Sequence, residues 1–304
     1  MLKNYKITFE HNESRIDRWL KRIFSTLNQS FIEKSLRKNL IKVNKKKVSA
    51  KYKLKENDIV NIFNYSKESY YSLPTISLKH KISYSLKIQF KKSIIFENNN
   101  FIIINKWDGI PTQGGSKVKC SINDIIKDTS NDYNLVHRLD KDTSGLLIIS
   151  KNLIYTKLFG QMFKKKQIKK KYLAICEGVP KKHDSSITFN AVDKKKPDVL
   201  KEAITKYKVI SYKDNISIIT FEPLTGKKHQ LRIASKYLGC PIIGDTKYNA
   251  KKNYDKEILK LNSYLLQFKI EDEIFNFRSE LPHHLIDFIN KKKLDLLEKN
   301  ISIS

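Results

Sequence analysis

The sequence is poor in cysteine, glycine and proline, and each scarcity excludes a class of protein. The three cysteines, Cys120, Cys176 and Cys240, are widely spaced and form no CxxC pair. They exclude a disulfide framework, and no Cys or His neighbours them at zinc-ligand spacing, so reduced thiols and no metal are expected. With 9 glycines and 7 prolines in 304 residues, a collagen-like fibre is excluded as well.

Long hydrophobic runs are also lacking. The first fifteen residues contain no apolar segment typical of a signal peptide, and the runs at 101–104 and 146–149 are too short to span a bilayer. We therefore expect a cytoplasmic protein in which these runs are buried strands. Hydrophobic residues make up 40% and aromatics 11%, which allows a substantial core and excludes chain-wide disorder.

Acidic residues are few beside the basic ones. The chain has 31 Asp and Glu against 60 Lys and Arg, a formal net charge of +29. Such a field suits a polyanion such as nucleic acid, or an anionic membrane surface. A lysine-rich composition without functional meaning is the alternative. Residues 1–75 share the excess, with 17 basic and 7 acidic side chains.

The first segment, 1–70, is predicted to be a small basic α/β domain. An i, i+3, i+4, i+7 stripe of Ile16, Trp19, Leu20 and Ile23 predicts a first helix. A second helix is expected to start with a capping box formed by Ser30 and Glu33. Two strands follow, in 41–48 and 53–63. The basic side chains on the outward face of the second helix and in the turn after it are candidates for phosphate contacts: Lys34, Arg37, Lys38, Lys42 and Lys45. An ordinary solvated helix face is the alternative.

The rest of the chain predicts an α+β fold rather than a doubly wound sheet. Residues 71–92 have no clear period and are interpreted as a linker, and 93–290 as the main domain. Within it, strands are expected at 94–97, 101–106, 146–150, 170–178, 202–210 and 215–223, with helices over 153–164 and in the later part of 226–238. The tail, 291–304, is predicted to form a short fraying helix.

The densest polar string is LVHRLDKDTSG at 135–145, which leads into the buried strand at 146–150. Side chains at the entry to a buried strand can be held rigidly and still meet a substrate. Asp140 lies between Arg138 and Lys141 and is expected to be ionised, able to act as nucleophile or base. Considered without further information, a polar turn with Asp140 as a capping residue is the more economical interpretation.

Five motifs, in a fixed order along the chain, favour the functional interpretation of Asp140 over a polar turn. They are HRLDKDTSGLLIISK (137–151), NKWDGIPTQGG (105–115), KKKYLAICEG (169–178), PLTGKKHQLRIASKYLGCPIIGD (223–245) and FNFRSELP (275–282). Together they resemble the RluA/RluC/RluD family of RNA pseudouridine synthases over nearly the whole chain. Residues 15–60 are similar to the S4-like RNA-binding module of the large-subunit rRNA members, the RluC-type arrangement. Departures include Trp107 where Pro is usual, and Lys227 and Lys228 for Arg-Thr.

The resemblance implies a fold, a reaction and roles for individual residues. The fold is a mixed, mainly antiparallel sheet flanked by helices and loops. Asp140 matches the catalytic aspartate, Tyr172 the active-site tyrosine, Arg232 the basic residue paired with that aspartate, and Arg138 the arginine that flips the target nucleotide. Further RNA contacts are expected at His137, Lys227, Lys228, His229 and Gln230. Without the resemblance, Tyr172 would be interpreted as a core tyrosine and Arg232 as a helix-surface arginine.

The expected activity is isomerisation of specific uridines in large-subunit (23S) rRNA, by a monomer that needs no cofactor. A catalytically silent RNA-binding or ribosome-assembly protein and a tRNA-directed pseudouridine synthase are the alternatives. A base deaminase would need an HxE and a PCxxC zinc site, and neither string occurs. Phosphate contacts by the basic surface predict affinity that falls steeply with salt.

Overall fold

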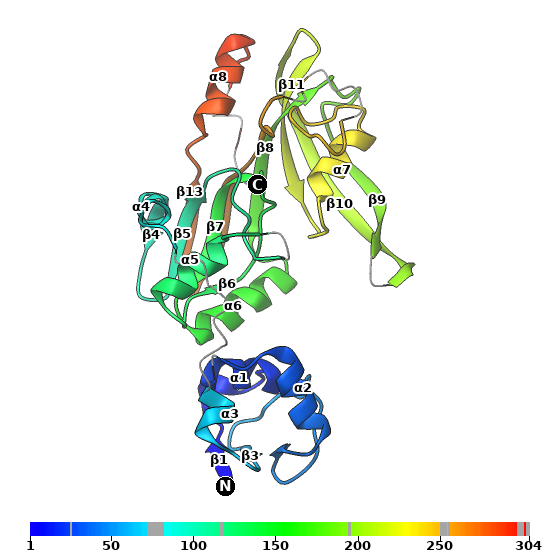
Figure 1. The fold of residues 1–304 in the computed structure, drawn as a ribbon. Helices are drawn as coiled ribbons and strands as arrows, with labels where there is room; N and C mark the ends of the chain where they lie inside the picture. The colour runs from blue at the N-terminus through cyan, green and yellow to red at the C-terminus, as the bar shows by residue number, and fades with distance from the viewer. Residues whose placement is uncertain are drawn as a thin grey trace. The chain divides into compact units, whose positions relative to one another are not determined.

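The structure is a computed structural model that describes residues 1–24, 26–71, 82–115, 118–193, 196–249, 254, 256–296 and 301. The chain divides into two compact units, Met1–Lys81 and Ile82–Ser304 (Figure 1). Each unit has its own hydrophobic core.

The first unit is a small three-stranded sheet with helices. Its elements are β1 (Lys3–Lys6), a 3-10 turn (Phe9–His11), α1 (Ile16–Ile23), α2 (Gln29–Arg37), β2 (Ile41–Val43), β3 (Ile59–Ile62) and α3 (Lys67–Tyr71). The strand order is β1-β3-β2, and both pairs are antiparallel. The predicted stripe of α1 is confirmed, because Ile16, Trp19 and Leu20 are buried in the core of this unit. Strand β1 was not predicted, since its four residues show no apolar alternation.

The predicted start of the second helix was wrong. Asn28, not Ser30, is the N-cap of α2, and its side chain accepts a hydrogen bond from the Phe31 backbone N–H at 2.8 Å. Ser30 falls within the first turn, and Glu33 accepts a bond from Gln29 instead. An Asn side chain two residues earlier supplies the same acceptor that the serine would have offered, so the helix begins before the expected position.

The second unit is built on a ten-stranded sheet, and its α+β class and mixed topology confirm the predicted fold. The path is β4-β5-β7-β12-β8-β11-β10-β9, with β13 beside β12 and β6 beside β7. Among the described strands, β7 and β12 pair in parallel and the other pairs are antiparallel. The strands are β4 (Ile94–Glu97), β5 (Phe101–Lys106), β6 (Asn134–Leu135), β7 (Ser144–Ser150), β8 (Lys169–Glu177), β9 (Asp184–Asp193), β10 (Lys196–Lys213), β11 (Ile216–Pro223), β12 (Leu261–Ile270) and β13 (Glu273–Arg278).

Strand β7 lies inside the sheet and is buried along its whole length. Its side chains alternate between two cores, as the two-residue period of a strand requires. Leu147 and Ile149 pack in the cluster that contains Tyr172, whereas Leu146 and Ile148 pack in the other cluster. The prediction of a buried strand at this position is therefore confirmed.

Gly145, at the start of β7, allows a close approach to β12. Its φ is +103°, and a Cβ at this position would lie 2.4 Å from the backbone oxygen of Ser263. Gly145 is paired with Ser263, which is paired in turn with Tyr172 on β8. The absence of a side chain thus brings the loop that precedes β7 into one row with Tyr172.

Helices cover the sheet of the second unit. They are α4 (Tyr84–Lys92), α5 (Ile122–Thr129), α6 (Leu153–Lys164), α7 (Gln230–Tyr237) and α8 (His283–Lys291). Helices α6 and α7 confirm the sequence predictions, and α7 packs on β9, β10 and β11 (Figure 1).

The structure differs from the prediction in the linker and in the tail. Helix α4 forms where the sequence indicated no periodic element: Ser83 caps it and Phe90 is buried. Its Leu86 and Phe90, at i, i+4 spacing, are too few to stand out as a pattern, and 72–81 lies outside the described residues. The helix predicted in the tail (291–304) does not form over 292–296, and 297–300 and 302–304 lie outside the described residues.

Candidate active site

A cavity of about 440 Å³ opens where the loop between β6 and β7, strand β8 and the start of α7 meet. Most of the residues that line it come from three of the five motifs found in the sequence. Nine of the predicted site residues are among them: His137, Arg138, Asp140, Tyr172, Lys227, Lys228, His229, Gln230 and Arg232. The cavity thus joins segments almost a hundred residues apart along the chain.

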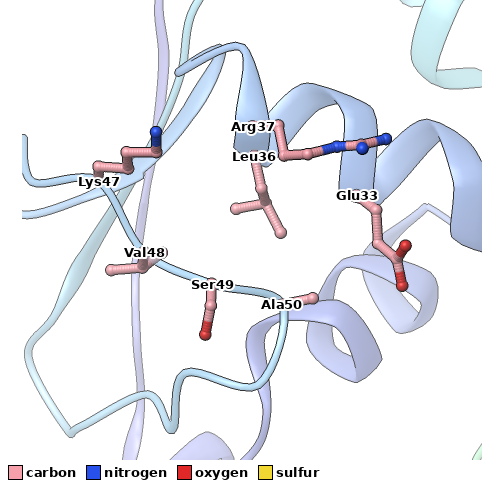
Figure 2. A pocket seen from close by; sticks show the side chains of 7 residues that line it. All are labelled: Glu33, Leu36, Arg37, Lys47, Val48, Ser49 and Ala50. Carbon is pink, nitrogen blue, oxygen red and sulfur yellow. The ribbon is translucent and has the colours of Figure 1, made fainter.

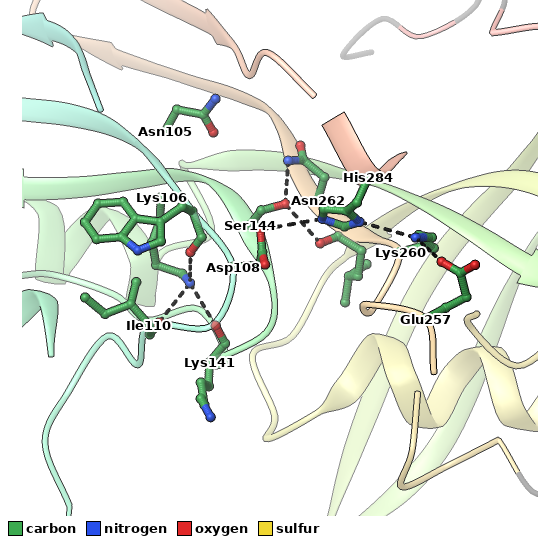
Figure 3. A network of polar contacts seen from close by, with 12 residues as sticks. Asn105, Lys106, Asp108, Ile110, Lys141, Ser144, Glu257, Lys260, Asn262 and His284 are labelled. Carbon is green, nitrogen blue, oxygen red and sulfur yellow. Dashed lines mark hydrogen bonds and ion pairs between the residues drawn. The ribbon is translucent and has the colours of Figure 1, made fainter. Parts of the chain in front are cut away.

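The loop that carries Asp140 is anchored on both sides. The buried Thr112 hydroxyl donates to the Leu139 backbone oxygen at 2.7 Å and accepts from the Leu139 N–H at 3.1 Å. The Lys106 ammonium donates to the backbone oxygen of Lys141 at 3.1 Å, and also to two carbonyls of its own turn (Figure 3). Burial lowers the pKa of Lys106 to about 7. Asp140 is therefore held between two fixed neighbours.

The carboxylate of Asp140 faces the cavity, with 22% of its side chain exposed. The imidazole of His229 lies beside it, with Nε2 3.8 Å from Oδ1 of Asp140. Burial lowers the pKa of His229, although the negative charge of Asp140 opposes the shift. His229 is thus a neutral imidazole at physiological pH, with one N–H to donate.

Tyr172 lies in the wall of the cavity and is 8% exposed. Burial raises the pKa of Tyr172 to about 12. The phenol therefore stays protonated near neutral pH, where it can donate a hydrogen bond and present its ring but cannot serve as a base. The ring is both part of the core and part of the cavity wall, so the two interpretations of Tyr172 are not exclusive.

Arg232 lies in the cavity, but its partner differs from the expected one. Its Nε and Nη2 each donate a hydrogen bond to Asp245 at 2.7 Å, which forms a bidentate ion pair. The prediction that Arg232 pairs with Asp140 was therefore wrong. Asp245 also accepts the backbone N–H groups of Lys247 and Tyr248 at 2.9 Å. At 9% exposure, Arg232 is not a helix-surface residue. The first turn of α7 faces the strands, which buries the guanidinium.

Two of the predicted RNA contacts bind the protein itself. His137 Nε2 accepts the Ile148 backbone N–H at 2.9 Å, and burial lowers the pKa of His137 to about 3, so it is neutral. The Gln230 amide donates to Ile204 and Thr205, and its oxygen accepts from Thr225 and Lys227. These two side chains line the cavity, but their polar atoms bind neighbouring parts of the protein. Sequence alone gives no sign of this, since both residue types also suit RNA binding.

The cations that remain available lie at the cavity mouth and on the first unit. Arg138 and Lys228 are exposed and Lys227 is half-buried. In the first unit, Lys34, Arg37, Lys38 and Lys45 are exposed, as predicted for an outward basic face, and Lys42 lies over the ring of Phe63. A groove of about 410 Å³ lies beside α2, and Arg37 and Lys47 are among the residues that line it (Figure 2).

Comparisons with known proteins identify the family. Residues 100–236 match the model of RNA pseudouridylate synthase. The chain is similar to "Ribosomal large subunit pseudouridine synthase C" of Rickettsia felis, with 38% identity over 90% of this chain and 95% of that one. The protein of the same name from Buchnera aphidicola subsp. Baizongia pistaciae is 32% identical, over 86% and 85% of the two chains. This chain belongs to the RNA pseudouridine synthase family.

The fold of this pseudouridine synthase is similar to that of a solved structure. "Human RNA Pseudouridylate Synthase Domain Containing 4" is 23% identical and covers 70% of this chain and 97% of its own, with a TM-score of 0.63. Within the described ranges, no three His, Cys, Asp or Glu side chains gather as metal ligands. None of the helices in that same part of the chain is long and apolar enough to cross a membrane.

Three residues of this synthase site were not predicted as functional. Asp245 binds Arg232, Tyr248 contacts His229, and Lys106 anchors the loop of Asp140. Lys106 and Asp245 both stand inside motifs that carried the family resemblance. A lysine at the end of the apolar strand β5, as at 106, was the available signal.

Proposed function

We propose that this pseudouridine synthase isomerises specific uridines in large-subunit rRNA, with Asp140 as its catalytic carboxylate. The observation that carries the proposal is the single cavity lined by Asp140, Tyr172 and Arg232. Curated relatives that match most of the chain are named for the large ribosomal subunit, which supports this target over tRNA.

The reaction makes demands that this cavity can meet. The N1 glycosidic bond breaks, the uracil rotates, and it rejoins the sugar through C5. A closed pocket must retain the detached base, and about 440 Å³ is within the range that encloses small ligands. Attack on C1′, attack on C6 and removal of a sugar proton would each use the same carboxylate, on the fixed loop between Leu139 and Lys141.

The other side chains have distinct tasks in this proposal. The Tyr172 ring stacks on the uracil, and its protonated phenol donates a hydrogen bond. Arg232, kept charged by Asp245, provides positive potential beside Asp140 without binding it directly. The target base must leave its stack at a cost of about a few kcal/mol. Arg138, exposed at the mouth, is long and planar enough to fill the vacated place.

Binding would rest on phosphate contacts. Lys227 and Lys228 lie at the cavity, and the basic face of the first unit adds further cations. Such contacts position RNA without reading its sequence. We propose that this unit acts as an S4-like RNA-binding domain over residues 1–70 and that the catalytic domain (93–290), followed by a tail, also includes α4, because Phe90 is buried in its core. The predicted linker (71–92) is then shorter by this helix. The protein is further proposed to work as a cytoplasmic monomer without a cofactor.

Mapping of pseudouridines tests the target. Carbodiimide modification and primer extension would be applied to 23S rRNA and tRNA from cells with and without the gene. We expect one or more 23S rRNA stops to vanish without the gene and to return on complementation. Loss confined to tRNA would contradict the rRNA assignment, and unchanged stops in both RNAs would contradict the activity in cells.

A further inference from the structure

Tyr248 contacts three polar residues at the cavity: His229, Arg232 and Asp245. Its hydroxyl lies 2.9 Å from Nδ1 of His229. Its ring lies 5.2 Å from the Arg232 guanidinium, and its backbone N–H donates to Asp245. The opposite nitrogen of His229, Nε2, lies 3.8 Å from Oδ1 of Asp140. A continuous chain therefore runs from the Tyr248 hydroxyl through the imidazole to the carboxylate.

The position of Tyr248 is fixed independently of its hydroxyl. Asp245 accepts its backbone N–H at 2.9 Å while the same carboxylate holds Arg232. The Tyr248 ring meets the His229 ring edge-on, at 5.7 Å between centroids. His229 is the N-cap of α7 in a left-handed conformation, with φ 53°. Backbone and ring contacts thus aim the hydroxyl at Nδ1, so its removal need not move the ring.

The chain selects one tautomer of His229. A neutral imidazole carries a single proton, and the partner of one nitrogen decides where it sits. If the Tyr248 hydroxyl donates to Nδ1, the proton is on Nε2 and points to Oδ1 of Asp140. The other tautomer would turn the Nε2 lone pair toward a carboxylate, which is repulsive. At 3.8 Å the contact is long, as catalytic hydrogen bonds commonly are before substrate binds.

We propose that Tyr248 is a positioning residue for isomerisation: it fixes the Nε2–H tautomer of His229, which orients Asp140 through Oδ1. Oδ2 then keeps its lone pairs for the nucleoside. The inference rests on the proposed catalytic role of Asp140. It assigns a task to the tyrosine hydroxyl that neither packing nor RNA binding requires.

Two substitutions separate this task from a structural one. Tyr248→Phe removes the hydroxyl and keeps the ring against Arg232. Tyr237→Phe is the matched control, because Tyr237 lies at the far end of α7 and is 66% exposed. Single-turnover release of tritium from 5-tritiated uridine RNA gives the rate, and a binding titration gives the affinity. We expect Tyr248→Phe to lower the rate about five- to tenfold, the value of one hydrogen bond, with unchanged affinity. Tyr237→Phe should match the wild type.

Nitrogen NMR of histidine-labelled protein reads the tautomer without any RNA. The wild type should show His229 protonated at Nε2, and Tyr248→Phe should shift part of the population to Nδ1. An unchanged tautomer, or a shifted tautomer with a wild-type rate, would overturn the inference. If Asp140→Asn kept full activity, the proposed function would fail instead, and the NMR result would still stand on its own.

A double variant checks that the effect passes through the imidazole. His229→Asn tolerates the left-handed backbone and removes the ring. If Tyr248 acts through His229, adding Tyr248→Phe to His229→Asn should slow the reaction no further. Independent, multiplying losses would show that the hydroxyl acts by another route and would refute the chain described here.

Discussion

Asp245→Asn tests the buried pair that holds Arg232 in the cavity. The substitution preserves the size of the side chain but removes its charge. Asp245 accepts four hydrogen bonds, two from Arg232 and two from backbone N–H groups, and its side chain is fully buried. An asparagine has one oxygen, and its amide would confront a donor. The guanidinium would remain buried without a counter-charge.

The magnitude follows from that burial. Removing one partner of a buried ion pair costs about 3–5 kcal/mol, a large share of the 5–15 kcal/mol typical of a domain. Burial disfavours ionisation of Asp245, but the bonds from Arg232 outweigh it and lower the pKa of Asp245. A carboxyl whose pKa is lowered by folding stabilises the folded state at pH values above its ordinary pKa of 3.8. This contribution is lost as the pH falls through the folded-state pKa. The penalty should therefore be full at pH 7 and shrink below about pH 3.8.

Urea unfolding of the full chain measures the effect, followed by a near-ultraviolet signal of the second unit. The matched control is Asp272→Asn, because Asp272 and Lys269 form an exposed pair at 3.3 Å, and exposed pairs contribute little. A loss below about 1 kcal/mol for Asp245→Asn at pH 7, or a loss equal to that of the control, would refute the argument from burial.

Further predictions concern the sheet, the cavity wall and the basic face. Gly145→Ala should lower the free energy of unfolding by about 3 kcal/mol, because the residue has a positive φ and its new Cβ would overlap β12. Gly109→Ala should cost about 1 kcal/mol, because Gly109 has a φ of +78° but no neighbour within 4 Å of the added Cβ. Equal losses for the two variants would contradict the close approach of Gly145 to β12. The low pKa of His137 means that the unfolded state takes up a proton between pH 6.5 and 3 while the folded state does not, so stability should fall by about 1.4 kcal/mol per pH unit on acidification. His137→Gln should show a flatter profile, and parallel profiles would exclude this cause. RNA affinity should fall steeply with salt. In a variant with glutamine at Lys34, Arg37 and Lys38, the slope of log affinity against log salt concentration should be smaller in magnitude by about 2–3. An unchanged slope would show that these three residues do not contact phosphates.

Sequence patterns predicted the elements that have a strong local signal. The buried strand β7 and the twelve-residue helix α6 follow from the apolar run at 146–150 and the helical pattern of 153–164, and both appear at the expected positions. Strand β1 and helix α4 were missed because a short exposed strand and a helix with two apolar anchors carry almost no period. The cap of α2 was misplaced because two nearby polar residues offered equivalent acceptors.

The sequence predicted which residues form the site better than it predicted which of them bind one another. Sequence placed Asp140, Tyr172 and Arg232 in one site, and the cavity contains all three. It could not show that Arg232 binds Asp245 rather than Asp140, because the pairing depends on how α7 docks on the strands. Tyr248 and its bond to His229 depend on the same docking.

Tritium release by an Asp140→Ala variant tests the central claim most directly. The assay uses purified full-length protein and rRNA labelled at uridine C5, with RNA binding measured in parallel. Asp142→Ala is the control, because Asp142 is exposed on the same loop and does not line the cavity. The account predicts no release by Asp140→Ala with binding retained, and normal release by Asp142→Ala. Release by Asp140→Ala at the wild-type rate would contradict it.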